Sequence, residues 1–146
     1  MQIKLFVLDP PSQSSFEKYR AEGGMVVVNF IPETSVIASV KSSLTSIATD
    51  GWLKDSKGHP RTSGSYAKIL GEFVRQKKAM TLMDAIRKSS LMPAQRLEQR
   101  APDFLRKGRI KIGADADICI FDPGNVIDNS TYANPSATST GFHHVI

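Results

Sequence analysis

The spacing of apolar and polar residues predicts mainly helices in the middle of the chain. Residues 66–74 carry apolar side chains at the i, i+3, i+4, i+7 and i+8 positions of an amphipathic helix, which is the clearest periodic signal in the sequence. Thr81 followed by Asp84 resembles a capping box, so a second helix is expected to begin there. Pro93 is expected to break that helix and to start a further helical turn.

The N-terminal part predicts a strand, a helix and a second strand. Residues 25–30 form a continuous, β-branched apolar run that is typical of a buried parallel strand. A helix is expected over residues 34–41 and a second strand over residues 44–49. This order matches a right-handed crossover between parallel strands. An earlier short helix over residues 16–22 is expected, capped by Ser15.

Turn-rich and β-rich patterns complete the picture. Residues 52–64 are polar and contain several turn formers, so a loop is expected there. Short strands are expected over residues 109–112 and 117–121, and the chain ends in what resembles another strand at 144–146. The sequence therefore predicts an α/β segment followed by a separate β layer.

Asp50 is the most interesting polar position, because it would follow a parallel strand. Open α/β sheets and barrels carry their working residues at that edge. Asp50-Gly51 is also a common turn dipeptide, and position alone favours this structural interpretation. His59 and Arg61 share the next loop, where an imidazole and a guanidinium could bind a carboxylate, although most loop residues of these types are simply solvated.

The composition and net charge of the chain argue against several classes of function. With 40% hydrophobic and 23% charged residues the chain is typical of one globular domain, and the N-terminal apolar run is too short for a membrane span or signal. The single Cys119 excludes an intrachain disulfide and fits a cytoplasmic protein. A net charge of +5 could attract an anionic partner, yet the basic residues alternate with acidic and apolar ones and lack stacking aromatics, which argues against nucleic acid.

Several catalytic motifs are absent from the sequence. It has no His-x-His, His-Glu-x-x-His or Gly-x-Ser-x-Gly pattern, and its three histidines and one cysteine cannot easily supply a zinc site. His143 and His144 are adjacent, so in a strand they would point to opposite faces and could not chelate one metal together.

Three stretches, taken together, resemble the D-aminoacylase (N-acyl-D-amino-acid deacylase) branch of the amidohydrolase superfamily. They are Ile47-Ala48-Thr49-Asp50-Gly51 with His59-Pro60-Arg61, then Pro93-Ala94-Gln95-Arg96, then residues 107–123, which read Gly, apolar, Gly, Ala-Asp, strand, Asp-Pro. The similarity runs from about Gly23 to Ile146 with the motifs in order. Thr49 departs from the serine that is usual in the family.

This resemblance implies the C-terminal portion of a (β/α)8 barrel, with strands of the accompanying small β-sandwich domain. Residues 1–107 would be the partial barrel segment and residues 108–146 the partial sandwich segment. Asp50 would be the catalytic general base and acid, and Arg61 with His59 would bind substrate. The family uses zinc, but its metal ligands lie in segments that this sequence lacks, so no metal or other cofactor is expected in this chain.

The resulting prediction is a fragment of a metal-dependent amidohydrolase that cleaves the amide bond of N-acyl-D-amino acids or related amides. The fragment is expected to be inactive alone. Its expected partners are the missing N-terminal barrel half, whether joined or supplied by another chain, or further copies through exposed sheet edges. The alternative is a non-catalytic binding or assembly module that uses a basic helical face between Arg75 and Arg106.

Overall fold

The computed structural model describes residues 12–23 and 31–146, and most of its regular structure is helical. The N-terminal apolar run at residues 3–8 and the strand predicted over residues 25–30 lie outside the described residues. The elements in chain order are α1 (Gln13–Glu22), α2 (Glu33–Lys41), β1 (Leu53–Lys54), β2 (Lys57–Gly58), α3 (Arg61–Lys68), η1 (Ile69–Gln76), α4 (Leu82–Ile86), η2 (Arg87–Leu91), α5 (Met92–Leu97), η3 (Pro102–Arg106), β3 (Cys119–Phe121) and β4 (Phe142–Val145).

The predicted helices are present, with some differences at their ends. The helix expected over residues 34–41 is α2, and the periodic run at 66–74 lies inside one continuous helix made by α3 and the wider π-helical turns of η1. That helix begins at Arg61, so the predicted loop ends sooner than expected. In α1 the cap is Ser12 rather than Ser15, because the Ser12 hydroxyl accepts the Ser15 N–H at 3.1 Å.

Pro93 does not break its helix, contrary to the prediction. Thr81 caps α4 as expected by accepting the Asp84 N–H at 3.1 Å, and the chain then continues through η2 into α5. Proline lacks an N–H and crowds the carbonyl four residues before it. The wide turns of η2, which directly precede α5, are the local distortion that accommodates it.

The strand predictions are partly wrong. Residues 44–49 form no strand; a turn at residues 43–44 is followed by irregular backbone, and the Ile47 N–H binds the carbonyl of Lys88 at 3.0 Å. Residues 109–112 also form no strand, and Ile112 is fully exposed there. The paired strands in the described part are two antiparallel hairpins, β1–β2 and β3–β4, so the expected parallel crossover is not seen among these residues. The strand at the chain end is confirmed as β4.

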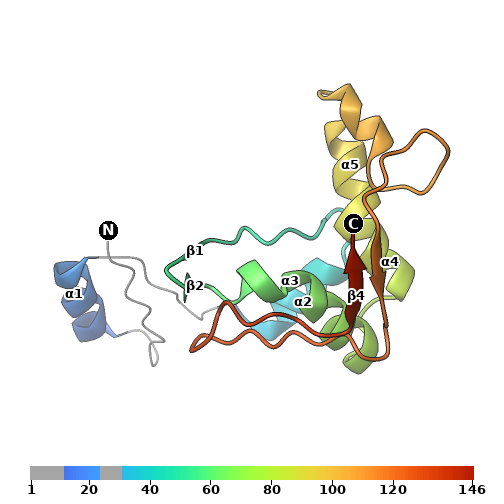
Figure 1. Cartoon of the computed structure of the whole chain (residues 1–146). Helices are drawn as coiled ribbons and strands as arrows, with labels where there is room; N and C mark the ends of the chain where they lie inside the picture. The colour runs from blue at the N-terminus through green and yellow to red at the C-terminus, as the bar shows by residue number, and fades with distance from the viewer. Residues whose placement is uncertain (1–11, 24–30) are drawn as a thin grey trace.

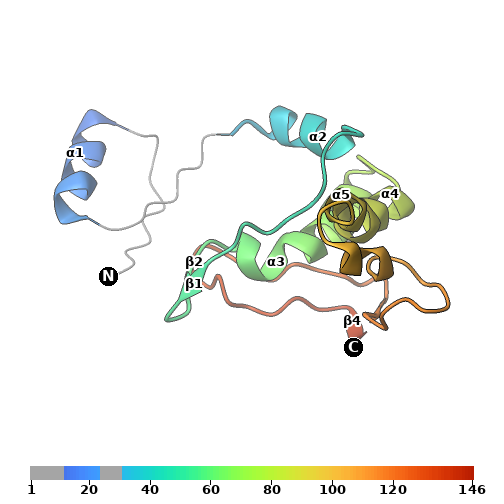
Figure 2. The same cartoon turned by 90° about the horizontal axis from the view of Figure 1, so that it is seen from above.

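The core lies where η1 meets α2, α4 and the tail, which consists of residues 122–141 between β3 and β4. Ile69 and Phe73 of η1 pack with Val40 of α2, Ala85 of α4 and Val126 of the tail, and both Ala85 and Val126 are 0% exposed. Figure 2 shows these helices gathered on one side while the tail passes along α3. The tail segment is therefore part of the same packed unit as the helices.

Arg75 and Gly71 fasten the tail to η1. The Arg75 guanidinium donates to the carbonyls of Pro123 at 2.9 Å and Val126 at 2.7 Å. A Cβ on Gly71 would stand 2.6 Å from the Val126 carbonyl oxygen, so only glycine allows the helix and tail to approach this closely. After this contact the tail continues beside α3 toward the β1–β2 hairpin (Figure 1).

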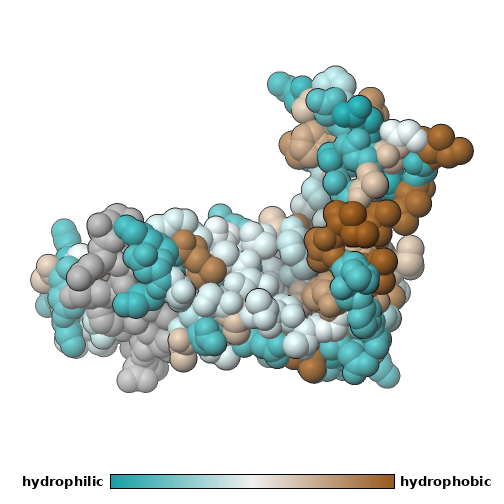
Figure 3. Space-filling view, in the orientation of Figure 1, coloured by the Kyte–Doolittle hydropathy of each residue, from teal (hydrophilic) through white to brown (hydrophobic). Residues whose placement is uncertain are grey.

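Two parts of the surface differ in character. The helix ending in α5 and η3 projects away from the body (Figure 1), and apolar surface gathers near its base and on the adjoining loop (Figure 3). Exposed apolar residues in this part of the chain include Ile110, Ile112, Ile120 and Val145. Within residues 12–23 and 31–146, no helix combines the length and apolarity that crossing a bilayer requires.

Candidate functional site

Asp50 and Arg61, two of the predicted site residues, are in direct contact. Arg61 Nη2 lies 2.8 Å from Asp50 Oδ2, and Arg61 Nε donates to the Asp50 carbonyl at 3.0 Å. Arg61 is the first residue of α3, so the helix start places the guanidinium beside Asp50. Both side chains are exposed, Asp50 at 88% and Arg61 at 46%, so the carboxylate remains open to solvent.

The backbone at Asp50-Gly51 is shaped by two separate constraints. Asp50 itself adopts a left-handed conformation with φ of 42°, a region that aspartate tolerates better than most residues. Gly51 is needed for space instead, because a Cβ there would stand 2.6 Å from the Thr62 Cα in α3. The backbone conformation and the close packing against Thr62 hold Asp50 beside the start of α3.

His59, the third predicted site residue, lies just before the start of α3. Its Nδ1 accepts the Arg61 N–H at 3.0 Å, and its ring meets Tyr132 edge to face with centroids 5.3 Å apart. Burial lowers the pKa of His59, and the positive charges of Arg61 and Lys68 lower it further. The structure therefore brings Asp50, His59 and Arg61 together around the N-terminus of α3.

Tyr132 is the residue at this site that sequence reasoning missed. It belongs to the tail and is far from His59 along the chain, with no motif or period connecting the two. The tail is rich in Asn, Ser, Thr and Pro, a composition typical of loops that gives no information about which residues they contact. Long-range loop contacts of this kind have no local sequence signal.

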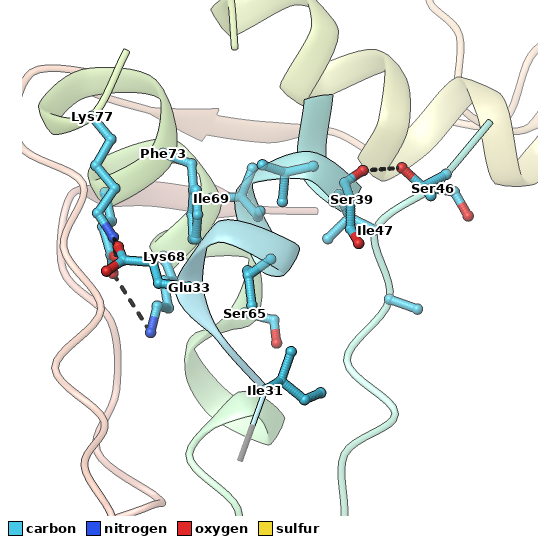
Figure 4. Close-up of a pocket in the computed structure, with 15 residues that line it drawn as sticks. Ile31, Glu33, Ser39, Ser46, Ile47, Ser65, Lys68, Ile69, Phe73 and Lys77 are labelled. Atoms are coloured by element: carbon cyan, nitrogen blue, oxygen red, sulfur yellow. Dashed lines mark hydrogen bonds and ion pairs between the residues drawn. The ribbon is translucent and has the colours of Figure 1, made fainter. Parts of the chain in front are cut away.

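A separate groove of about 720 Å³ lies between α2, residues 45–48 and the helix made by α3 and η1 (Figure 4). Val36, Ile47 and Phe73 contribute apolar surface to it, and Lys77 bridges Glu33 and Glu72 at its edge. None of Asp50, His59 and Arg61 lines this groove. The predicted site is instead an exposed surface beside it.

The described residues do not fit a complete metal centre. Among residues 12–23 and 31–146, no three or more His, Cys, Asp or Glu side chains are grouped to hold a metal ion. A catalytic zinc site needs three protein ligands and an open position.

The basic face expected between Arg75 and Arg106 is partly occupied by internal contacts. Arg75 binds tail carbonyls, Lys77 pairs with two glutamates, and Lys88 is buried. Arg106 pairs with Asp103 and Asp115 at 3.5 and 3.4 Å. These contacts support structure, and nothing about them favours an anionic polymer as partner.

Sequence comparison finds three curated relatives from Alcaligenes xylosoxydans xylosoxydans, while no protein-family model matches the chain. An N-acyl-D-glutamate deacylase is 35% identical over 68% of this chain, an N-acyl-D-aspartate deacylase 32% over 70%, and a D-aminoacylase 31% over 69%. In each case the match spans only 20% of the relative.

Solved structures of the same kinds of enzyme resemble this chain in fold. A D-aminoacylase, described as defining a novel subset of amidohydrolases, superposes with a TM-score of 0.72 at 28% identity, over 80% of this chain and 23% of that chain. N-acyl-D-glutamate deacylase from Bordetella bronchiseptica, complexed with zinc and a phosphonate mimic of the tetrahedral intermediate, has a TM-score of 0.71 at 32% identity with the same coverage.

Proposed function

Because the chain is a relative of the D-aminoacylase branch of the amidohydrolases, we propose that it supplies a proton-transfer carboxylate and a substrate-facing turn to an enzyme that hydrolyses N-acyl-D-amino acids. The observation that carries this proposal is the grouping of Asp50, His59 and Arg61 in a chain related to deacylases. The chain spans about a fifth of those relatives, so the rest of the catalytic machinery would come from additional sequence.

Asp50 is suited to proton transfer because its carboxylate is exposed and held from one side. Amide hydrolysis requires a base that takes a proton from the attacking water and an acid that returns one to the departing amine nitrogen. A single carboxylate can do both in turn. Arg61 orients this carboxylate by binding Oδ2 and the backbone carbonyl of the same residue.

The substrate side of the site consists of Arg61 and His59 in this proposal. An N-acyl amino acid carries a carboxylate, which a guanidinium binds through charge-assisted hydrogen bonds. In the structure two donors of Arg61 already bind Asp50, so Arg61 would share its remaining donors with substrate. His59 adjoins it across a single turn and adds a second polar group.

We also propose that residues 1–107 correspond to a barrel segment and residues 108–146 to part of a β-sandwich in the complete enzyme. The likeness to the D-aminoacylase fold over 80% of the chain supports this assignment. The open hairpin edges of β3–β4 and the exposed apolar side chains near 110 and 145 would be covered by that additional structure or by another copy of the chain.

A chimera tests the proposed function. The matching fifth of N-acyl-D-glutamate deacylase would be replaced by residues of this chain, and release of glutamate from its N-acyl substrate would be measured. We expect deacylation by the chimera and none by the isolated chain. Asp50→Asn should lower the chimera's kcat by at least about 100-fold, the usual contribution of a positioned acid or base.

Asp55→Asn is the matched control, because Asp55 is a nearby exposed aspartate that also has a positive φ, 52°. It should leave kcat unchanged. Equal activity of the Asp50→Asn chimera and its parent would refute the assignment of Asp50. Circular dichroism and gel filtration of each chimera establish that the variants being compared are folded.

A further inference from the structure

The tail segment 128–139 is docked on the turn that leads into α3. Ser130 Oγ lies 3.0 Å from the Pro60 carbonyl oxygen and 2.6 Å from Asp128 Oδ1, two acceptors that share its single proton. The Ser130 N–H also donates to Asp128 Oδ1 at 2.8 Å. Asp128 also packs directly against Gly64, where a side chain on the helix would collide with its carboxylate. This end of the tail therefore has a defined position beside the candidate site, as the shared course of tail and α3 in Figure 1 and Figure 2 also shows.

Docking of the tail brings Tyr132 against His59. The two rings meet at an interplanar angle of 72° with centroids 5.3 Å apart, an edge-to-face arrangement that is favourable beyond the area it buries. Tyr132 is half-buried, so the contact is not a chance overlap of two solvated side chains. The imidazole is thus packed on one side by an aromatic ring.

A hydrogen bond fixes which nitrogen of His59 carries the proton. Nδ1 accepts the N–H of Arg61 at 3.0 Å, so its lone pair is used and a neutral ring must carry its proton on Nε2. The charged groups facing the ring are Arg61 and Lys68 of the α3 helix, and the tail adds the Tyr132 phenol. Burial and these two positive charges lower the pKa of His59, so the neutral ring is favoured.

We propose that Tyr132 is a positioning residue that holds His59 as an Nε2–H donor directed at a carboxylate or carbonyl oxygen of an N-acyl amino acid. The substrate class rests on the proposed function, whereas the holding of His59 by Tyr132 does not. The tail would thereby become the third element of the site, after the segment ending at Asp50 and the start of α3. Nε2 donates a hydrogen bond and transfers no proton.

Nuclear magnetic resonance of the full chain tests the positioning step directly. Long-range proton–nitrogen spectra report the tautomer and pKa of each histidine, and His59→Gln identifies the signals of His59. Tyr132→Leu should raise the pKa of His59 toward the ordinary value of 6.5, because water reaches the ring. It should also introduce the Nδ1–H tautomer, because a ring that Tyr132 no longer packs can turn away from the Arg61 N–H. Tyr132→Phe keeps the ring contact and should change neither property.

Tyr66→Leu is the matched control, because Tyr66 is an exposed tyrosine on α3 and its loss should leave the His59 signals in place. An unchanged His59 pKa and tautomer in Tyr132→Leu would overturn the positioning role. A shift of the same size in Tyr66→Leu would overturn it as well, since the effect would then be general.

The chimera described above tests the substrate step with N-acetyl-D-glutamate as the probe. Tyr132→Leu should raise KM about tenfold, which is the cost of one hydrogen bond, with a much smaller change in kcat. An unchanged KM would overturn the substrate-facing role of His59. Failure of the proposed function has a different signature, full activity in Asp50→Asn, and the measurements on His59 stand independently of turnover.

Discussion

The segment of residues 42–50 connects α2 to the candidate site, and its two ends are held by different kinds of contact. A buried charge binds the first end, and an exposed ion pair binds the second. At its beginning, Lys88 is only 4% exposed and its ammonium donates to the Val40 carbonyl at 2.6 Å, to the Ser42 carbonyl and to the Thr45 hydroxyl at 3.3 Å. These acceptors match the three donors of an ammonium group. At its far end, Asp50 meets Arg61 in an ion pair that is open to water.

This difference indicates which residues stabilise the fold and which are free to take part in chemistry. A buried charge is tolerated only when its hydrogen bonds are complete, and removing it leaves buried acceptors without donors. An exposed ion pair is screened by water and contributes little to folding. We therefore expect substitutions at Lys88 to affect folding strongly and substitutions at Asp50 or Arg61 to affect folding weakly, whatever they do to activity.

Lys88→Met should have the largest effect on stability. Methionine has a similar length but donates no hydrogen bond, so the carbonyls of Val40 and Ser42 lose their partner at the end of α2. We expect a loss of about 3 kcal/mol in the free energy of unfolding, measured by urea denaturation. Arg87→Met, at the exposed neighbouring position, is the control and should stay within about 0.5 kcal/mol. Equal losses in the two variants would show that the buried Lys88 contributes no more to stability than an exposed residue does.

Gly71→Ala tests whether the tail is held as firmly as the buried end of the segment. On an open helix this change stabilises by up to about 1 kcal/mol. Here the new methyl group would stand 2.6 Å from the Val126 carbonyl, and moving that backbone would disturb the core. We expect a net loss of about 2 kcal/mol by the same measurement. A stabilised variant would show that the backbone at Val126 can move away from the helix at little cost in free energy.

The helices could be predicted because their signals are local. The period of residues 66–74 and the Thr81 cap each depend on neighbours three or four positions away, and both elements are present in the structure. The strand at residues 44–49 was wrong for the opposite reason. A strand needs a paired neighbour, and in the described residues the Ile47 N–H instead binds Lys88 of a helix.

The candidate site shows the same limit. The motif around Asp50 and the loop with His59 and Arg61 could be found from the sequence, and the structure brings these residues together. Neither the Arg61–Asp50 pairing nor the Tyr132 contact could be found, because each depends on how distant segments pack. The burial of Lys88 could not be predicted either, since in the sequence it is one of several basic residues between Arg75 and Arg106.

Acidification should lower the free energy of unfolding through His59, which contacts Arg61 near the exposed Asp50. Its folded pKa lies below the ordinary 6.5, so the unfolded chain binds the proton first as the pH falls. Stability is therefore full above about pH 6.5 and declines as the pH falls toward the folded pKa, below which the loss is constant. Urea denaturation between about pH 7.5 and pH 5 should show a smaller decline for His59→Gln than for the parent chain. Identical pH profiles would show that His59 has the same affinity for protons in both states.

Asp50→Asn should have the smallest effect on folding. Asparagine tolerates the left-handed backbone at position 50 as well as aspartate does, so the substitution removes the charge and leaves the φ of 42° without added strain. We expect a change within about 0.5 kcal/mol that shrinks further when salt is added, because the lost ion pair with Arg61 is exposed. A loss above about 2 kcal/mol would mean that this end of the segment is also part of the stabilising framework. A near-neutral result, combined with the loss of deacylation expected in the chimera, would instead place the contribution of Asp50 in chemistry rather than in folding.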